Sequence, residues 1–472
     1  MLCTDMNPDP PSKSCKQQPK QDPKRKSKPN SKVLLADTIG QALYERLQAR
    51  LDGPVSIHHP LAPWPSVHSS SSIHSTSTRT LSPATSTSDI KSIVSSRTSH
   101  DSMPKPPLPP PLPNRIITLA GPNTSLEALS TITRLAAQHS QVSHMGLLDP
   151  SYSIFLHTTH TAALCFKILH KTAIISGDPI SHPSDISALL SEFHTYRKAH
   201  HLGIAFLGAS PILTHYADAT VQPWTLLHFG KERVLNPTTN PILHETTGKR
   251  ILLQTKQLLH PTKGNLTLDI YIPTTPKKDL DITLETSLQS IYNTWRTTRN
   301  ASTTPQAFIT SYNLFPTTPL MTYIYARAPT GEPIAFAALR YLGAKTGYHI
   351  DPCIAAPTAP KGTTDLLLFA AMALCKTAGV SYLSIGYEPF EELGEVSGLP
   401  SALEHVTRKM YRFAFGRLPL AGKKAYHDKW RPEEELEEPL YLVFPGGGVP
   451  EIRAVVAVMH VANVRIRRVV WG

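Results

Sequence analysis

A sharp change in composition limits which part of the chain can form a globular core. The first 113 residues contain a basic run broken by prolines at 16–28, a stretch rich in serine and threonine at 66–102, and the proline tract PKPPLPPPLP at 104–113. Such segments bury too little apolar surface to offset the entropy lost on ordering. We therefore expect residues 1–113 to be a disordered region. Within it, the apolar spacing at 34–51 predicts a short amphipathic helix.

Charge and cysteine usage narrow the class of protein. The 472 residues are enough for about two or three domains. The net charge of +12 favours an anionic partner, whether nucleic acid, an acidic membrane surface or a phosphorylated substrate. The five cysteines are odd in number and form no CxxC pair, which argues against a disulfide scaffold or zinc ribbon and favours a reducing compartment. We find neither a secretory signal nor an apolar stretch that predicts a transmembrane helix.

Helical and strand patterns alternate after residue 114, in an order that occurs twice. In the first copy we expect helices at 125–139 and 184–200, the latter capped by Ser184, and β-structure at 116–121, 152–159, 162–170, 171–177, 203–210, 225–230 and 248–256. In the second we expect helices at 284–299, 303–312 and 365–379, and strands at 321–328, 333–343, 346–354 and 380–389. The repeat predicts two similar α/β domains side by side, at 114–262 and 263–448, followed by a tail at 449–472.

The tail is apolar but carries several arginines. It is expected either to lie in a membrane interface as an amphipathic segment or to pack on the domain as a last strand or helix.

Several common catalytic signatures are missing from the sequence. We find no P-loop, no GxSxG elbow, no HExxH and no GxGxxG motif, and the 22 histidines lack ligand spacing, so we expect no metal site. The loop APKGTTD at 359–365 is a candidate anion site, because a loop that leads into a helix N-terminus presents free backbone amides. Lys361, Gly362 and Thr363 lie there. The alternative is that Asp365 simply complements the helix dipole.

A second candidate site is the basic and aromatic stretch at 408–431. Cations contact phosphates and aromatic faces stack on unpaired bases, so this composition fits the single-stranded end of an RNA. The residues of this stretch that we expect to act are Arg408, Tyr411, Arg412, Arg417, Lys429 and Trp430. The alternative is that the aromatics belong to the core of a strand and the cations form its solvated side.

A third candidate is a set of polar groups at the ends of predicted strands, namely His349, Asp351, Tyr387 and Glu388. Carboxylates in such positions can orient or deprotonate a nucleophile, or hold an amino group. The alternative is that Asp351 caps a turn and that Glu388 is solvated.

In these residues the chain resembles the C-terminal catalytic domain of bacterial lysylphosphatidylglycerol synthases, and more closely the free-standing fungal members that aminoacylate ergosterol. The matching motifs follow the family's order: Gly177-Asp178-Pro179, Ile350-Asp351, the loop 359–365, Gly386, Tyr411-Arg412-Phe413, Gly416, Lys423, Tyr426 and Trp430. The segment from 416 to 430 is slightly longer than usual, and the customary second lysine and the proline before Trp430 are missing. These departures leave the separate roles of Lys423 and Lys424 open.

The resemblance implies two tandem acetyltransferase-like (dual GNAT) domains in which aminoacyl-tRNA replaces acetyl-CoA, with no cofactor. The expected partners are aminoacyl-tRNA, a membrane lipid and a separate aminoacyl-tRNA synthetase, since neither a synthetase domain nor the bacterial membrane domain is recognisable here. By analogy with the fungal relatives, the expected amino acid is glycine and the acceptor is the 3β-hydroxyl of ergosterol. The expected location is cytoplasmic and peripheral to membranes.

On this view the catalytic residues are Asp351, Glu388, Lys423 and Lys424. Lys423, Lys424 or backbone amides would stabilise an oxyanion, and Asp351 or Glu388 would hold the α-ammonium or accept a proton. The alternatives are a phosphatidylglycerol aminoacyltransferase and an inactive RNA- or membrane-binding module. An acetyl-CoA-dependent enzyme is disfavoured because neither half has a glycine-rich pyrophosphate loop.

Overall fold

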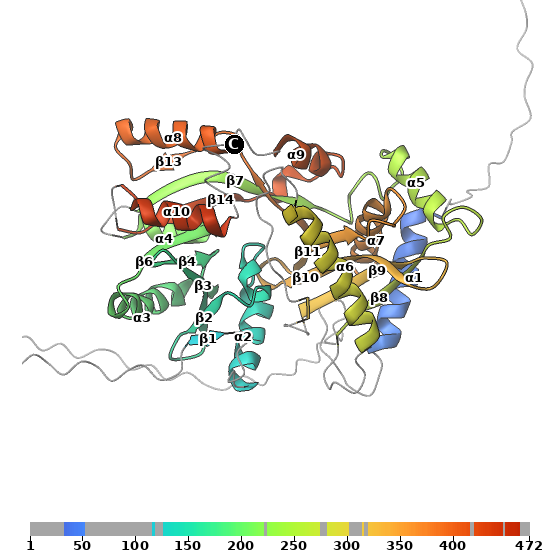
Figure 1. The fold of residues 1–472 in the computed structure, drawn as a ribbon, viewed down its shortest axis with the longest axis horizontal. Helices are drawn as coiled ribbons and strands as arrows, with labels where there is room; N and C mark the ends of the chain where they lie inside the picture. Colours follow the sequence, from blue (N-terminus) through green and yellow to red (C-terminus); the bar gives the residue numbers. More distant parts are fainter. Residues whose placement is uncertain are drawn as a thin grey trace, which may run out of the picture. The chain divides into compact units, whose positions relative to one another are not determined.

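The structure is a computed structural model of the chain (Figure 1). It describes residues 33–51, 116–118, 126–220, 224–273, 281–301, 314–315, 320–415, 420–446 and 449–462. The elements from helix α1 onward belong to one compact unit. Most of the stretch expected to be disordered, and the helix expected at 303–312, lie outside the described residues.

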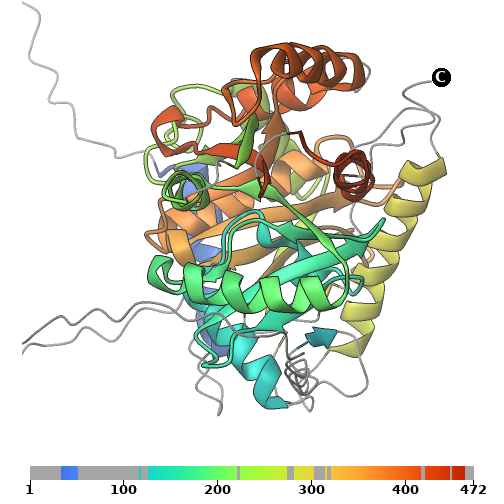
Figure 2. The same ribbon diagram turned by 90° about the vertical axis from the view of Figure 1, so that its left-hand side faces the viewer.

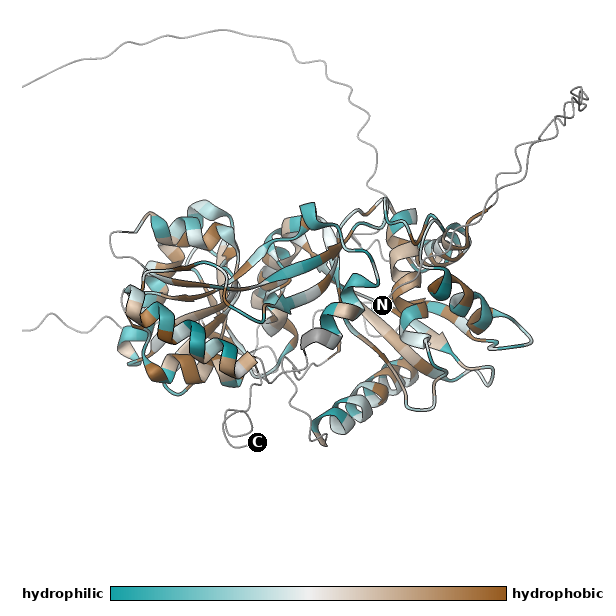
Figure 3. Ribbon diagram, turned by 90° about the horizontal axis from the view of Figure 1, so that it is seen from above, coloured by the Kyte–Doolittle hydropathy of each residue, from teal (hydrophilic) through white to brown (hydrophobic). Residues whose placement is uncertain are grey.

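A single mixed sheet runs through the described chain. Its strands follow the order β1-β2-β3-β4-β6-β14-β7-β12-β11-β10-β9-β8, and the short strands β5 and β13 pair with β3 and β7. The bounds are β1 Ile116–Thr118, β2 Ser153–Leu156, β3 Ala162–Leu169, β4 Thr172–Ser176, β5 Ile180–Ser181, β6 Gly203–Ala209, β7 Thr225–Leu235, β8 Thr267–Tyr271, β9 Met321–Arg327, β10 Pro333–Leu342, β11 Gly347–Ala355, β12 Leu383–Pro389, β13 Val396–Ser397 and β14 Pro439–Phe444. The strands are largely apolar, while many loops between the elements are polar (Figure 3). This confirms the predicted mixed α/β class.

The predicted repeat is visible in the strand pairing. Each half has an antiparallel run of strands followed by one parallel pair that a helix connects. In the first half α3 (Ile186–Ala199) joins β4 to β6, and in the second half α7 (Thr363–Thr377) joins β11 to β12. Helix α3 covers the face of the first half, where Leu189 and Phe193 pack against Phe155 and Phe166 (Figure 2).

The two halves share strands, which the sequence did not predict. Strand β7 of the first half pairs with β12 of the second, and β14 from the end of the second half lies between β6 and β7. The division at 262/263 therefore does not separate two independent sheets. The expected side-by-side domains are one continuous sheet, because each half supplies a strand to the other.

Helix α1 (Leu35–Leu51) belongs to the folded unit although it precedes the predicted boundary at residue 113. Ala36, Leu43 and Leu47 lie on one face at helical spacing and are buried against α7. A Cβ on Gly40 would lie 2.4 Å from the carbonyl oxygen of Ala373, so the glycine permits close approach of the two helices. The predicted amphipathic helix is confirmed, but it belongs to the folded unit.

Two local predictions were wrong. Residues 248–256, expected to add β-structure, begin helix α5 (Lys249–Leu259), which buries Ile251, Leu252, Thr255 and Leu258 at helical spacing. Ser184 does not cap α3, because a turn of 3₁₀ helix at Pro183–Asp185 precedes that helix. In that turn the His182 side chain accepts a hydrogen bond from the Ser184 amide.

The described part of the tail is helix α10 (Ile452–Val461). Ala454, Ala457 and Val458 are buried, and the helix packs on β4 and β6. The alternative of a helix packed on the domain is thus confirmed for 452–461. Residues 463–472 lie outside the described chain. Among the described helices, none has both the length and the hydropathy that crossing a bilayer requires.

The remaining helices cover the faces of the sheet. They are α2 Leu126–His139, α4 Pro211–Asp218, α6 Ile282–Ala301, α8 Ser401–Phe415 and α9 Leu420–Asp428.

Candidate active site

In the second half, the parallel strands β11 and β12 separate from each other near the polar residues that they carry. Strands β11 and β12 pair only at Tyr348 with Leu383 and at His349 with Ser384. The pairing of β12 with β7 shifts register between Ser384 and Tyr387, which marks a β-bulge that includes Gly386. In the first half, by contrast, β4 and β6 pair along five consecutive residues, 172–176 with 203–207. Of the two parallel pairs, the one in the second half is therefore the open one, and its strand β11 carries Asp351.

A cavity of about 150 Å³ lies at this opening. Both halves line it, together with Val461 of α10. The first half contributes Val142, Ser143, Met145, Tyr152, Ser176 and Leu207, and the second contributes His349, Asp351, Ile385, Gly386, Tyr387 and Lys423. The structure thus brings two predicted catalytic residues, Asp351 and Lys423, to one cavity. The contribution of the first half could not be read from the sequence.

His349 is buried beside this cavity. Its Nδ1 has no hydrogen-bond partner among the described residues, and Nε2 lies 3.3 Å from where a Cβ on Gly386 would be. Burial, followed by the positive charges of Arg340 and Lys423, holds the pKa of His349 well below its usual value. The ring is therefore neutral at physiological pH and has a nitrogen that can accept a proton.

Lys423 reaches the cavity from α9. Burial lowers the pKa of its ammonium group, while the neighbouring carboxylates of Asp351 and Glu388 raise it. The residue as a whole is nevertheless exposed. Access to water and two nearby carboxylates favour the charged form, so we treat Lys423 as a cation. Lys424, the next residue, is exposed and does not line the cavity.

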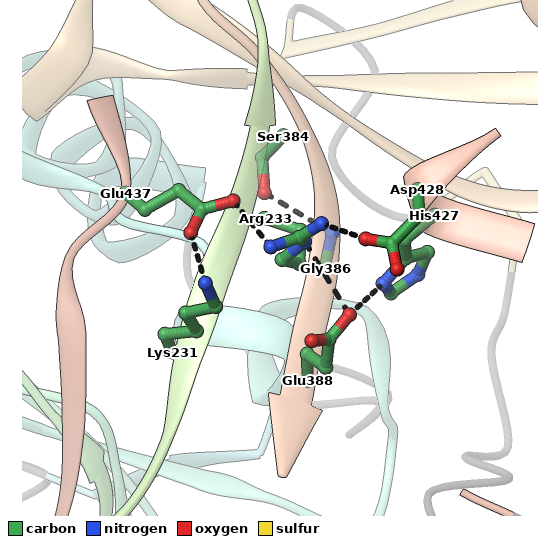
Figure 4. A network of polar contacts seen from close by, with 8 residues as sticks. All are labelled: Lys231, Arg233, Ser384, Gly386, Glu388, His427, Asp428 and Glu437. Atoms are coloured by element: carbon green, nitrogen blue, oxygen red, sulfur yellow. Dashed lines mark hydrogen bonds and ion pairs between the residues drawn. The ribbon is translucent and has the colours of Figure 1, made fainter. Parts of the chain in front are cut away.

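Glu388 belongs to a network of charged side chains (Figure 4). Arg233 of β7, opposite the bulge in β12, is at the centre of this network. Its Nε lies 3.3 Å from Oε2 of Glu388 and its Nη1 lies 2.9 Å from Oε1 of Glu437, and Nη2 also pairs with Asp428. Glu388 is thus held by the fold and does not line the cavity, so this geometry gives no support to the direct catalytic role expected from the sequence.

The same network fixes α9, the helix that carries Lys423. His427 Nδ1 lies 3.0 Å from Oε2 of Glu388. Burial and the nearby cations Lys423 and Arg233 lower the pKa of His427 to about 3, so the neutral ring donates a hydrogen bond from Nδ1–H to the Glu388 carboxylate. Burial raises the pKa of Glu388, and Arg233 opposes that rise. Sequence reasoning did not identify Arg233. The signal that could have indicated it is the presence of charged residues within the otherwise apolar strand TLLHFGKERVL.

The candidate anion loop lies at the start of α7 and outside the cavity lining. Lys361 is exposed, and its carbonyl accepts a hydrogen bond from Gln254 Nε2 at 2.8 Å. Gly362 has φ +90°, and a Cβ there would collide with the Gln254 amide. Thr363 is buried, and both its hydroxyl, at 2.6 Å, and its backbone amide, at 3.2 Å, donate to the Pro360 carbonyl, so neither group is available to an anion.

The described residues of the basic stretch at 408–431 form the end of α8, helix α9 and a turn after it, so the alternative of a strand is wrong for them. On α8, Arg408 pairs with Glu404 at 2.8 Å and Arg412 with Glu392 at 3.0 Å. The Tyr411 hydroxyl is buried within 3.0 Å of the carbonyl oxygens of Phe229 and Phe390, so Tyr411 anchors the helix. Arg417 lies outside the described residues.

Two other members of that stretch have structural roles. Trp430 is fully buried in the core that contains α7, so it cannot stack on a base without leaving the core, and the expectation that it contacts tRNA is corrected. Lys429 pairs with both carboxylate oxygens of Asp365, at 2.7 and 2.8 Å. This pair joins the end of α9 to the start of α7.

Asp178, singled out in the first half, is buried away from the cavity. It accepts hydrogen bonds from the Ser210 amide at 2.8 Å, the Ser210 hydroxyl and the Gln141 side chain. Burial raises its pKa, and the hydrogen bonds from Ser210 oppose the rise. Asp178 thus organises the start of α4, where Ser210 is the N-cap.

Residues 132–444 match the family model of the C-terminal domain of phosphatidylglycerol lysyltransferases. The chain belongs to this family. It is therefore an aminoacyltransferase domain, and family membership implies an aminoacyl-tRNA and a lipid as its substrates. The matched residues include every cavity-lining residue except Val461, whereas α1 and α10 lie outside the match.

Two solved structures, with TM-scores above 0.5, share the fold. The C-terminal domain of a lysylphosphatidylglycerol synthetase from Agrobacterium fabrum is 19% identical, with 72% of this chain and 96% of that chain covered and a TM-score of 0.53. L-PGS from Bacillus licheniformis is 15% identical, with 73% and 98% covered and a TM-score of 0.54. A tandem GNAT protein of clavulanic acid biosynthesis also matches, at 11% identity, with 69% and 96% covered and a TM-score of 0.29. No curated protein matches the sequence.

Proposed function

We propose that this phosphatidylglycerol lysyltransferase-type domain transfers glycine from glycyl-tRNA to the 3β-hydroxyl of ergosterol. The observation that carries the proposal is the cavity between the halves, which combines His349, Asp351 and Lys423 with apolar side chains. A sterol presents one hydroxyl on an otherwise apolar molecule, and this lining has the same distribution of polarity. The choice of glycine and ergosterol rests on the resemblance to the fungal members of the family.

The size of the cavity fits the reacting groups alone. Sites that enclose a whole drug-sized ligand have roughly 300–1,000 Å³, whereas this cavity has about 150 Å³. We therefore propose that the sterol hydroxyl and the aminoacyl group meet in the cavity while the rest of the lipid stays outside it. Lining residues Val142, Met145 and Leu207 provide an apolar side against which the first sterol ring can pack.

The transfer is a direct ester exchange in our proposal. The sterol oxygen attacks the carbonyl carbon of the aminoacyl ester, the bond to the ribose oxygen breaks, and the hydroxyl proton moves through His349 Nε2 to that ribose oxygen. One ester replaces another, so positioning supplies much of the rate, up to about 7–11 kcal/mol for well-oriented groups. Lys423 stabilises the tetrahedral oxyanion, a contribution of roughly 3–4 kcal/mol. Asp351 holds the α-ammonium of the amino acid.

The phosphates of the tRNA acceptor end are proposed to lie at the start of α7. Lys361 is exposed there, just before the N-terminus of α7, where the helix dipole favours an anion. Gly362 and Thr363 give this loop its shape, and Lys429 lies beside it through its pair with Asp365. We keep Lys361 and Lys429 as the proposed phosphate contacts on this surface.

The second candidate is a phosphatidylglycerol acceptor, which the family's name favours. Purified full-length protein is incubated with radiolabelled glycyl-tRNA or lysyl-tRNA and vesicles that contain ergosterol, phosphatidylglycerol or both. Label in the neutral sterol fraction supports our proposal, and label in the phospholipid fraction supports the second candidate. The Asp351→Asn variant is the matched control, because it removes the negative charge but keeps the shape of the side chain. Wild-type protein that leaves both fractions unlabelled points instead to an inactive RNA- or membrane-binding module.

A further inference from the structure

The outer face of α8 is apolar at its centre. Val406, Met410 and Phe413 are 51%, 64% and 48% exposed. Their spacing of four and three residues puts them on one side of the helix, and Ala402, also exposed, lies one turn before them. Exposed apolar residues are common singly, but three along one helix face form a patch that marks a contact with something outside the core.

The opposite face of the same helix already attaches α8 to the fold. Tyr411 is buried with its hydroxyl against two carbonyl oxygens, and its ring stacks on Phe415 with centroids 4.1 Å apart. Arg408 on that side pairs with Glu404 and with the carbonyl oxygen of Leu393. The inner face of α8 is therefore the face that attaches the helix to β7 and to the loop before the helix.

Basic groups flank the apolar patch. His405, Lys409 and Arg412 are exposed along one edge of the patch. Arg412 pairs with Glu392, and Glu391 and Glu395 of the same loop are also exposed. Lys409 has no ion pair among the described residues, so it is the cation that this edge can present to an anionic surface.

A bilayer fits this combination better than RNA does. RNA is held by cations on its phosphates and by flat aromatic faces on unpaired bases, and aliphatic side chains such as Val406 and Met410 supply neither. An interfacial helix instead buries an apolar face among lipid headgroups and keeps its cations at the level of the phosphates. The arginines of α8, expected from the sequence to contact tRNA, thus lie on a helix whose exposed face suits lipid.

We propose that the outer face of α8 docks on an anionic phospholipid membrane, with Val406, Met410 and Phe413 inserted among the headgroups and Lys409 and Arg412 beside the phosphates. This inference deepens the proposed function, because it provides the surface on which the lipid acceptor is met. Helix α9, which carries Lys423, follows α8 in the chain, and both helices lie along the upper side of the molecule in Figure 1. Docking through α8 therefore keeps the catalytic helix close to the bilayer.

Vesicle flotation of the full-length protein tests the docking surface. The vesicles are phosphatidylcholine alone or phosphatidylcholine with phosphatidylserine. The Val406→Asp/Met410→Asp double variant is expected to lower the partition coefficient by roughly tenfold or more. Lys409→Gln is expected to lower it by roughly fivefold on the anionic vesicles only. The control is Leu253→Asp on α5, a leucine that is 60% exposed on another helix and should leave partitioning unchanged.

Each other outcome contradicts the inference. Wild-type protein that fails to float with anionic vesicles, or a double variant that floats as well as wild type, would overturn it. A double variant that loses affinity for charged tRNA but not for vesicles would assign the face to RNA instead. Circular dichroism of the double variant verifies that it folds. If the two aspartates prevent folding, the Val406→Ser/Met410→Ser variant replaces it in the same assay.

Transfer assays separate this inference from the proposed function. The double variant should keep wild-type transfer to a sterol dispersed in detergent micelles and lose transfer to the same sterol in vesicles. If wild-type protein binds anionic vesicles through α8 but transfers no amino acid to any lipid, then the proposed function fails while the docking surface stands.

Discussion

His349 and Lys423 line one cavity, so the charge of one influences the protonation of the other. The positive charges that lower the pKa of His349 come from Arg340 on β10 and Lys423 on α9, and Asp351 lies two residues along its own strand. A base must be neutral to accept a proton. Because its pKa is lowered, His349 stays neutral, and so able to accept a proton, at pH values at which an ordinary histidine is already protonated.

The first prediction concerns the pH profile of transfer. Lys423→Gln removes one of the charges that lower the pKa of His349, so that pKa rises and the acid limb of kcat/KM moves to higher pH. Lys424→Gln on the same helix should leave the limb in place, because Lys424 is exposed and does not line the cavity. His349→Gln should lower transfer by roughly 10²–10⁴-fold. An acid limb that stays fixed in Lys423→Gln contradicts the assignment of His349 as base.

The second prediction concerns Arg233, whose side chain is 6% exposed between three carboxylates. Arg233→Met leaves these carboxylates without their central partner and is expected to cost about 3–5 kcal/mol in the free energy of unfolding. Arg412→Met is the matched control, since Arg412 and Glu392 are both 63% exposed and such a pair contributes about 0–1 kcal/mol. Urea unfolding of both variants measures the difference. Equal losses would show that the network does not hold α9.

At the scale of single elements, the sequence predicted most helices and strands because their apolar periods are clear. The strands from β2 to β4 and from β9 to β12, and the helices α2, α6 and α7, follow the predicted segments. Helix α5 was misread because KRILLQTK is short and carries aliphatic residues that suit a strand equally well. Only tertiary burial of Ile251, Thr255 and Leu258 distinguishes the two.

Our third prediction concerns the contact between α1 and α7. Gly40→Val puts a side chain where a Cβ alone would lie 2.4 Å from the Ala373 carbonyl oxygen, so it should destabilise the protein by about 1–3 kcal/mol. Gly422→Ala on α9 is the control, because nothing lies within 4 Å of a Cβ there. That substitution should be neutral or stabilising by up to about 1 kcal/mol. Thermal unfolding of the two variants makes the comparison, and a Gly40→Val protein as stable as wild type would contradict the packing of α1 on α7.

At the scale of the whole molecule, the candidate site depends on contacts that no local pattern records. Asp351 and Lys423 were predicted from motifs, but Arg233 and the cavity wall from Val142 to Leu207 come from the other half. They reach the site because β7 crosses to β12 and β14 returns between β6 and β7. Strand exchange of this kind leaves the local apolar pattern unchanged, so a repeat in the sequence predicts two halves without predicting how they share strands.

The shared strands lead to the fourth prediction. Because each half supplies a strand to the other, neither has a complete sheet alone, and the described fold should unfold in one cooperative transition. Tryptophan fluorescence and far-ultraviolet circular dichroism should give coincident curves in urea. Two separate transitions would contradict the exchange of β7 and β14.

The central claim, that the cavity between the halves joins an aminoacyl group to a lipid hydroxyl, is tested most directly by following the label of charged tRNA. Full-length protein with radiolabelled glycyl-tRNA and ergosterol vesicles should yield a labelled sterol ester that mild alkali cleaves to glycine, and Asp351→Asn and His349→Gln should form it far more slowly. A wild-type protein that leaves every tested aminoacyl-tRNA intact in the presence of sterol and phospholipid would contradict the account.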